Sequence, residues 1–85
     1  MMTVKYEEVE NYIYNILQDR LELFGITRGD FTDSFQLLPG VIDSIGFIEL
    51  VAQVEQNFEV EMDFEHSDPE QYTKLAGFIK CIKGF

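Results

Sequence analysis

The chain has 85 residues, 46% of them hydrophobic and 14% aromatic, which suffices for one small core and is too apolar for disorder. Sixteen acidic residues against six basic ones give a formal net charge of -10, which argues against nucleic-acid binding because that relies on clusters of Lys and Arg. Residues 1–85 are therefore expected to form a single domain that is attracted to basic protein surfaces, although an acidic mimic of DNA would share this charge.

The cysteine content and the hydropathy pattern favour a cytoplasmic protein. Cys81 is the only cysteine, so no internal disulfide can form, which fits a reducing compartment. No apolar run approaches the length of a membrane span, and the first residues lack the apolar segment of a signal peptide. We expect a monomer without a membrane span.

The first predicted element is a helix over about residues 3–24. Glu7 and Glu8 suit the positive end of its dipole, and Gly25 is a typical residue at which a helix ends. Polar side chains occupy the opposite side of the helix from the hydrophobic ones. The hydrophobic stripe consists of Tyr6, Val9, Ile13, Ile16, Leu17, Leu21 and Phe24.

A long segment without sustained periodicity, residues 25–42, follows this helix. Its sequence Leu38-Pro39-Gly40-Val41 suggests a type II turn. Linkers are polar, whereas this segment is rich in hydrophobic residues, so we expect it to pack over the helices. Those residues are Ile26, Phe31, Phe35, Leu37, Leu38 and Val41.

The second helix is predicted from Asp43 or Ser44 to about Phe58, with two distinct apolar sides. The inward side consists of Phe47, Leu50, Val51, Val54 and Phe58. Aliphatic side chains outside the core side of a soluble monomer indicate a surface where a partner docks. We call this surface the outward face; it consists of Ile45, Ile48 and Ala52 with Glu49 and Glu55 beside them.

The last part of the chain contains a short predicted helix at residues 68–72, with Pro69 at its first position, and a final helix. Thr73 is expected to cap the final helix. That helix carries Leu75, Phe78, Ile79 and Ile82 at helical spacing. The predicted fold class is therefore all-α: a small four-helix bundle of three main helices and one short helix, with a long loop between the first and second helices.

The sequence Asp43-Ser44-Ile45 is the strongest candidate site, because a helix start gathers unpaired N–H groups that favour an attached anion. Both Asp43 and Ser44 are also ordinary helix-capping residues, so the triplet alone is weak evidence. A second, similar triplet, Asp33-Ser34-Phe35, is followed by Gln36-Leu37-Leu38-Pro39, a segment that cannot propagate a helix. We therefore expect Ser34 to be a turn residue.

Residues 42–58 resemble the second helix of acyl and peptidyl carrier proteins in the order of their residue types. The preceding loop and residues 73–79 are similar to the same family in order and spacing. In that family the serine carries 4′-phosphopantetheine, so the resemblance implies that Ser44 is the attachment site and that the protein is not an enzyme. Asp43 would cap the helix and help a phosphopantetheinyl transferase and its magnesium ion engage.

The resemblance also implies the partners and the cargo. Besides the transferase, these are an acyl- or aminoacyl-loading ligase and downstream synthases with basic docking surfaces. Gly46 and Gln56 stand where carriers of fatty acid synthesis commonly have acids, and residues 68–72 look more like stand-alone carriers of aminoacyl or specialised acyl groups. A polyketide, nonribosomal peptide or D-alanyl-type pathway is thus favoured, with primary fatty acid synthesis as the alternative.

Other chemistry is not supported by the residues present. A hydrolase nucleophile would need a Gly-x-Ser-x-Gly elbow, whereas Ile42 stands two residues before Ser44. One histidine, His66, and one cysteine cannot build a typical zinc site, and residues 30–33 lack a calcium-ligand pattern, so no metal site is expected. The alternative from another class is an unmodified acidic helical adaptor that binds a basic protein.

Overall fold

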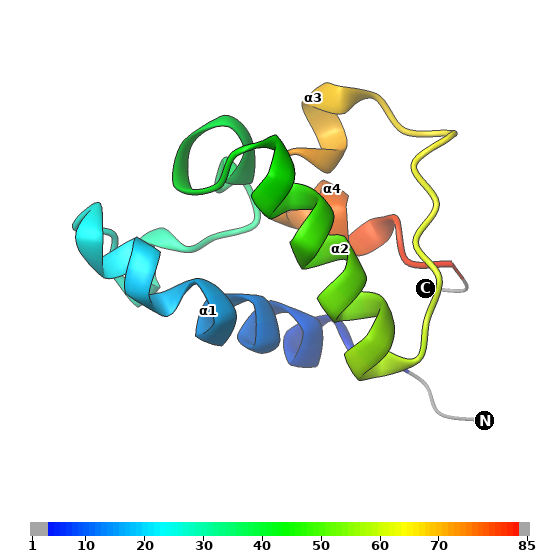
Figure 1. Ribbon diagram of the computed structural model, residues 1–85, viewed down its shortest axis with the longest axis horizontal. Helices are drawn as coiled ribbons and strands as arrows, with labels where there is room; N and C mark the ends of the chain where they lie inside the picture. Colours follow the sequence, from blue (N-terminus) through cyan, green and yellow to red (C-terminus); the bar gives the residue numbers. More distant parts are fainter. Residues whose placement is uncertain (1–3, 84–85) are drawn as a thin grey trace.

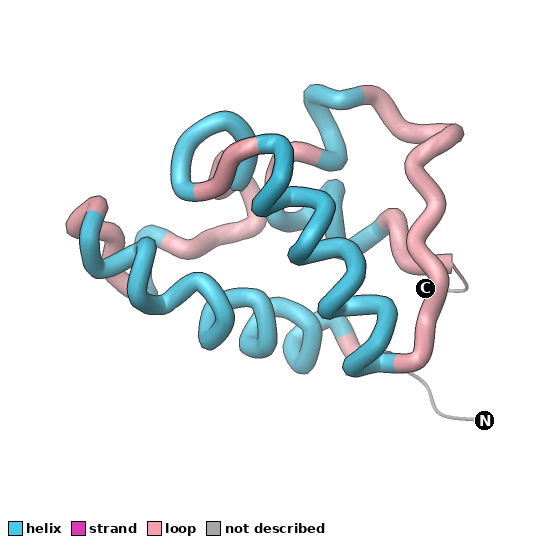
Figure 2. Tube along the Cα trace, in the orientation of Figure 1, coloured by secondary structure: helices cyan, strands magenta, loops and turns pink. Residues whose placement is uncertain are grey.

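A computed structural model describes residues 4–83, which contain four α-helices and no β-strand (Figures 1 and 2). The helices are α1 (Tyr6–Leu23), α2 (Ser44–Phe58), α3 (Pro69–Tyr72) and α4 (Leu75–Lys80). Between α1 and α2 lie a short 3-10 helix, η1 (Arg28–Asp30), and an irregular turn, η2 (Leu37–Val41). The prediction of a small all-α fold is confirmed. None of the helices within residues 4–83 has the length and hydropathy needed to cross a membrane.

Helix α1 buries part of the predicted stripe and ends where the sequence indicates. Four of its aliphatic side chains are buried, and the predicted start at residue 3 lies outside the described residues. Gly25 has a positive φ of 71°, and the Ile26 N–H donates to the Leu21 carbonyl at 2.8 Å, which is the bond of a Schellman motif. The prediction that Phe24 belongs to the buried stripe is wrong. Phe24 is the capping residue, where the chain leaves the helix, and its side chain is 62% exposed.

The core lies where α1, α2, α4 and the long loop meet. In Figure 1, α1 runs along the lower part of the view and α2 runs obliquely across the molecule. Helix α1 contacts α2, α4 and η2, while α3 packs against α4. Every residue in the core is apolar, and no charged or polar residue among those described is buried. The largest fully buried side chains include Phe31, Phe78, Ile13, Leu21, Leu37 and Leu50.

The long loop packs over the helices, as predicted. Its backbone runs beside the start of α4, since the Leu75 N–H donates to the Phe35 carbonyl at 2.9 Å and the Leu37 N–H donates to the Thr73 carbonyl at 2.8 Å. Phe31, Leu37 and Val41 are buried. The loop is thus a packed layer of the fold that leads directly into α2.

Side chains also fasten the loop to α1. Arg28 pairs with Glu10 at 3.2 Å and lies over the Tyr14 ring, 5.0 Å from its centroid. The Tyr6 hydroxyl donates to the Asp33 carboxylate at 2.6 Å. Burial, followed by the hydrogen bond to Asp33, raises the pKa of Tyr6. These contacts hold the first half of α1 against the loop.

The predicted type II turn at residues 38–41 is wrong. The Leu38–Pro39 peptide bond is cis, and Gly40 has φ 152° and ψ -103°, whereas the third residue of a type II turn has φ and ψ near +80° and 0°. The positive φ of Gly40 still explains why a glycine stands there.

The start of the last helix differs from the prediction. Helix α3 begins at Pro69 as predicted, but Thr73 does not cap α4. The Thr73 hydroxyl instead donates to the Pro69 carbonyl, and α4 begins at Leu75. Helix α4 ends at Lys80, so Ile82 is buried in the turn beyond the helix. The last helix is shorter than a main helix of a bundle.

Candidate functional site

Ser44 is the first residue of α2, and its side chain is exposed. The preceding residue, Asp43, has the extended backbone of a cap, and its carboxylate accepts the Gly46 N–H at 2.7 Å. The Phe47 N–H donates to the Asp43 carbonyl at 2.8 Å, which is the first bond of the helix. The prediction that Asp43 caps α2 is therefore confirmed, and the cap does not use the Ser44 hydroxyl.

Gly46 allows the cap to close tightly. A Cβ atom at this position would lie 3.2 Å from both the Asp43 carboxylate and the Ile42 Cβ, closer than an ordinary contact. An acidic side chain there would also place a second negative charge beside Asp43. Steric and electrostatic constraints at the cap therefore explain why a glycine occupies position 46.

The two sides of α2 lie as the sequence predicts. Phe47, Leu50 and Val54 are buried, while Val51 and Phe58 are half-buried. On the outward face, Ile45 and Ile48 are each 68% exposed, and Glu49 and Ala52 are also exposed. Four outward-face residues are therefore accessible, directly after the candidate attachment residue.

Glu55 differs from the other residues of the outward face. Its side chain is half-buried, and its carboxylate accepts the Met62 N–H at 3.0 Å. This bond joins the last turn of α2 to the segment that follows it. Glu55 thus has a structural partner that its position in the helix did not predict.

Ser34 lies in a turn, as predicted. Its hydroxyl is 3.4 Å from that of Thr32, and the neighbouring Asp33 bonds to Tyr6. The segment after Ser34 runs extended into η2, so no helix begins there. Of the two similar triplets, only the one containing Ser44 lies at a helix start.

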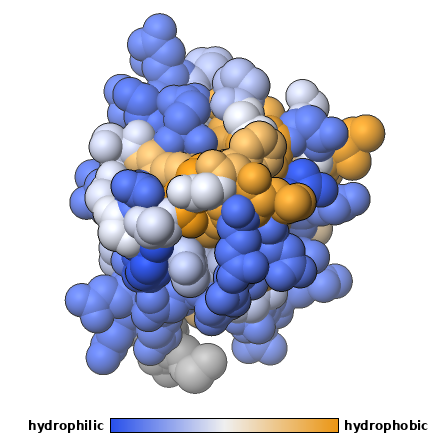
Figure 3. All heavy atoms as spheres, turned by 90° about the vertical axis from the view of Figure 1, so that its left-hand side faces the viewer, coloured by the Kyte–Doolittle hydropathy of each residue, from blue (hydrophilic) through white to orange (hydrophobic). Residues whose placement is uncertain are grey.

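A groove beside Asp43 was not predicted from the sequence. Its volume is about 550 Å³, and it is lined by Arg20, Leu23 and Phe24 from the end of α1 and by residues 39–43. Leu23 is 84% exposed and Phe24 is 62% exposed. Figure 3 shows an apolar patch on this end of the molecule, surrounded by hydrophilic side chains. We call the groove lined by Arg20, Leu23, Phe24 and residues 39–43 the α1 groove.

The sequence held one signal for the α1 groove. Leu21 fills the inward position in the last turn of α1, so the consecutive residues Leu23 and Phe24 cannot both turn inward at 100° per residue. Because Phe24 was predicted to be buried, no exposed apolar surface was expected at the end of α1.

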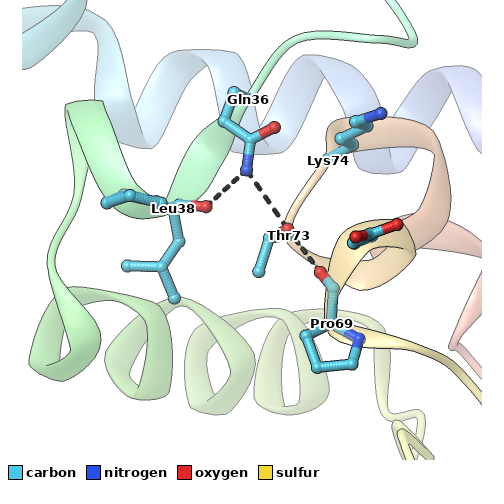
Figure 4. A pocket seen from close by; sticks show the side chains of 7 residues that line it. Gln36, Leu38, Pro69, Thr73 and Lys74 are labelled. Atoms are coloured by element: carbon cyan, nitrogen blue, oxygen red, sulfur yellow. Dashed lines mark hydrogen bonds between the residues drawn. The ribbon is translucent and has the colours of Figure 1, made fainter.

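A second cavity, of about 400 Å³, lies between the loop and α3 (Figure 4). The Gln36 amide donates to the Leu38 carbonyl and to the Thr73 hydroxyl oxygen, the latter at 3.2 Å. Pro69 and Lys74 form the opposite wall. The Gln36 amide therefore joins the loop to the end of α3 at this cavity.

The remaining candidates for chemistry are dispersed. Within residues 4–83 no group of three or more His, Cys, Asp or Glu side chains could hold a metal ion. His66 is exposed, and Cys81 is buried with its thiol 3.4 Å from the Ser67 hydroxyl.

Comparisons of this chain with protein-family models, with curated proteins and with solved structures find no match.

Proposed function

We propose that this protein is a stand-alone carrier of acyl or aminoacyl groups, with Ser44 as the attachment site of 4′-phosphopantetheine. One observation carries the proposal: Ser44 is exposed at the first position of α2, while Asp43 makes the capping bond. The Ser44 hydroxyl is therefore not used by the cap that holds the helix start. This supports the resemblance of residues 42–58 to carrier proteins, and we assign the four helices to the bundle of that family.

The residues around Ser44 fit a phosphodiester. The start of α2 carries the positive end of the helix dipole, which favours an anion attached there. A phosphopantetheinyl transferase would join the Ser44 oxygen to the pantetheine-side phosphate of coenzyme A. The pyrophosphate bond would break, the adenosine bisphosphate would leave, and the hydroxyl proton would pass to a base of the transferase. When bound, the arm supplies a terminal thiol that holds the cargo as a thioester.

The outward face of α2 is proposed as the docking surface. Ile45, Ile48 and Ala52 would contact apolar side chains of the transferase, the loading ligase and later enzymes, and Glu49 would face their basic rims. Glu55 would contribute its charge less directly, because its carboxylate bonds to Met62. Tethering the cargo beside this face raises its effective concentration at each partner's active site.

We favour a specialised polyketide, nonribosomal peptide or D-alanyl-type pathway in the cytoplasm, with the protein acting as a monomer. Gly46 supports this preference, because the tight cap beside Asp43 disfavours the acid that is common at this position in carriers of fatty acid synthesis. Primary fatty acid synthesis is the alternative.

A second function, an unmodified acidic adaptor, is favoured by the exposure of Ile45 and Ile48 among acidic side chains. Such an adaptor would bind a basic protein through the same face without any attached group. It gives Ser44 no role, so modification of Ser44 distinguishes the two functions.

Intact mass spectrometry tests the proposal. After incubation with coenzyme A and a broad-specificity transferase, the protein is expected to gain one phosphopantetheine. Ser44→Ala should gain none, and the matched control Ser34→Ala should behave as the wild type. Addition that persists in Ser44→Ala would contradict the assignment, and no addition to the wild type would favour the adaptor.

A further inference from the structure

The α1 groove combines apolar walls with one basic and one acidic side chain. Leu23 and Phe24 form its exposed apolar side, and residues 39–42 form the opposite side. Arg20 is the only basic residue that lines it. In a chain of net charge -10, a cation in an apolar groove selects for an anionic group that carries hydrocarbon.

Arg20 is held in place and still has donors to offer. One guanidinium nitrogen donates to the Val41 carbonyl at 3.3 Å, which fixes the side chain across the groove. A guanidinium has five N–H donors, so most of them stay available to an anion. Asp43 is the only acidic residue in the lining, and its carboxylate is already engaged by the Gly46 N–H.

The α1 groove reaches the residue next to Ser44. Asp43 lines the groove and precedes Ser44 directly, and consecutive Cα atoms lie about 3.8 Å apart. A group attached to the Ser44 oxygen therefore begins within reach of the groove. The outward face of α2, in contrast, has apolar and acidic side chains and no cation.

We propose that the α1 groove holds the first part of the arm attached to Ser44. Arg20 would pair with the phosphodiester, and Leu23 and Phe24 would pack against the branched dimethyl group of the pantoyl unit that follows it. This inference rests on the proposed function, because it needs the arm on Ser44. An arm held in the groove leaves Ile48 and Glu49 free to contact a partner.

Nuclear magnetic resonance of the loaded protein tests the proposal. The isotope-labelled protein is modified with unlabelled coenzyme A, and its mass is measured first. Nuclear Overhauser effects are expected between the dimethyl protons of the arm and the side chains of Leu23 and Phe24. Leu23→Gln should abolish the contacts to residue 23 and weaken those to Phe24, whereas the control Asn57→Gln, at an exposed position of α2 outside the groove and the outward face, should retain both.

Variants of Arg20 separate its charge from its structural bond. On loading, Arg20→Gln should lose the chemical-shift changes of the Val41 and Ile42 amides, and Arg20→Lys should retain most of them because the charge is kept. Amide spectra of the unloaded variants report whether each remains folded. If both variants disturb the loop before loading, the contacts of the dimethyl group in the wild type decide the proposal.

Each outcome has a definite meaning. A protein that gains no mass overturns both the carrier function and this inference. A protein that gains mass but shows no contacts with Leu23 or Phe24, or shows contacts with Ile48 instead, overturns only the groove. Concentration-dependent shifts at Leu23 and Phe24 in the unloaded protein, unchanged by loading, would assign the groove to a second copy of the chain.

Discussion

Gly77 lies against the backbone at the end of α3, where α3 and α4 pack together. A Cβ atom on residue 77 would come within 1.8 Å of the Gln71 carbonyl oxygen. The obstructing atom is backbone, so it cannot move away by a change of rotamer. At this residue the absence of a side chain is a requirement of packing.

Gly77→Ala is therefore expected to lower the free energy of unfolding by at least about 2 kcal/mol, as an overpacked core position does. Denaturant unfolding measures the change. Gly29→Ala is the matched control, because its Cβ would meet only the Thr27 hydroxyl oxygen, at 3.7 Å. We expect its effect to stay within about 0.5 kcal/mol. Equal effects of the two substitutions would contradict the close approach at Gly77.

Asp43 has two roles that can be separated by substitution. Asp43→Ala removes the bond to the Gly46 N–H and should cost about 1 kcal/mol of stability, whereas Asp43→Asn retains a good cap. Asn has no charge to offer a transferase and its magnesium ion. We therefore expect Asp43→Asn to melt near the wild-type temperature and to be modified more slowly. If Asp43→Asn is modified at the wild-type rate, the role of Asp43 is capping alone.

Helix α2 contributes one side to the core and exposes the other side to solvent. Its inward side is fixed by the core, with Val54 fully buried, while Ile48 is 68% exposed on the outward face. The bond from the Met62 N–H to Glu55 fastens the end of the helix, and Asp43 fastens its start. The outward face is therefore held at both ends of the helix and is accessible from Ile45 to Ala52.

Substitutions on the two sides of α2 should have opposite effects. Val54→Ala should destabilise the protein by about 1–3 kcal/mol, because it removes buried methyl groups. Ile48→Ala and Glu49→Lys should leave the melting temperature nearly unchanged and slow modification by a transferase or loading by a ligase. Thermal melts and rates of mass gain measure both. If Ile48→Ala unfolds the domain, the outward face has been assigned wrongly.

At the scale of the whole molecule, charge opposes compactness. The chain has a net charge of -10. Its described ion pairs are Arg28 with Glu10 and Lys83 with Glu61, and in each pair at least one of the two side chains is exposed. Exposed pairs contribute little to stability. Repulsion among the acidic side chains therefore acts on a small core with little margin.

Salt should move stability and binding in opposite directions. Moderate salt, with a Debye length of about 8 Å at 0.15 M, screens the repulsion and should raise the melting temperature. The same salt should weaken binding to a basic partner by screening the attraction across the interface. Melts and partner titrations at several salt concentrations test both trends. Affinity that is flat or rises with salt would mean that docking is apolar, through Ile45, Ile48 and Ala52.

The sequence by itself determined the features that depend on local chemistry. Helices α1 and α2, the sides of α2 and the Asp43 cap were predicted because hydrophobic spacing and capping involve residues only a few positions apart. The exposed position of Ser44 follows from that cap. Resemblance to carrier proteins predicted that Ser44 is an attachment site, which stays a prediction.

Only the tertiary structure decided the features that depend on residues far apart in the chain. Thr73 precedes the capping position of α4, which is Lys74, and its carbonyl accepts the N–H of the distant Leu37. The α1 groove exists because the loop brings residues 39–43 beside the end of α1. The path of the loop is set by the burial of Phe31, Leu37 and Val41 and by backbone bonds to residues 73 and 75, which no local pattern encodes. Hydrophobic periodicity specifies which side of a helix is buried, but the surface formed between two elements depends on how they pack.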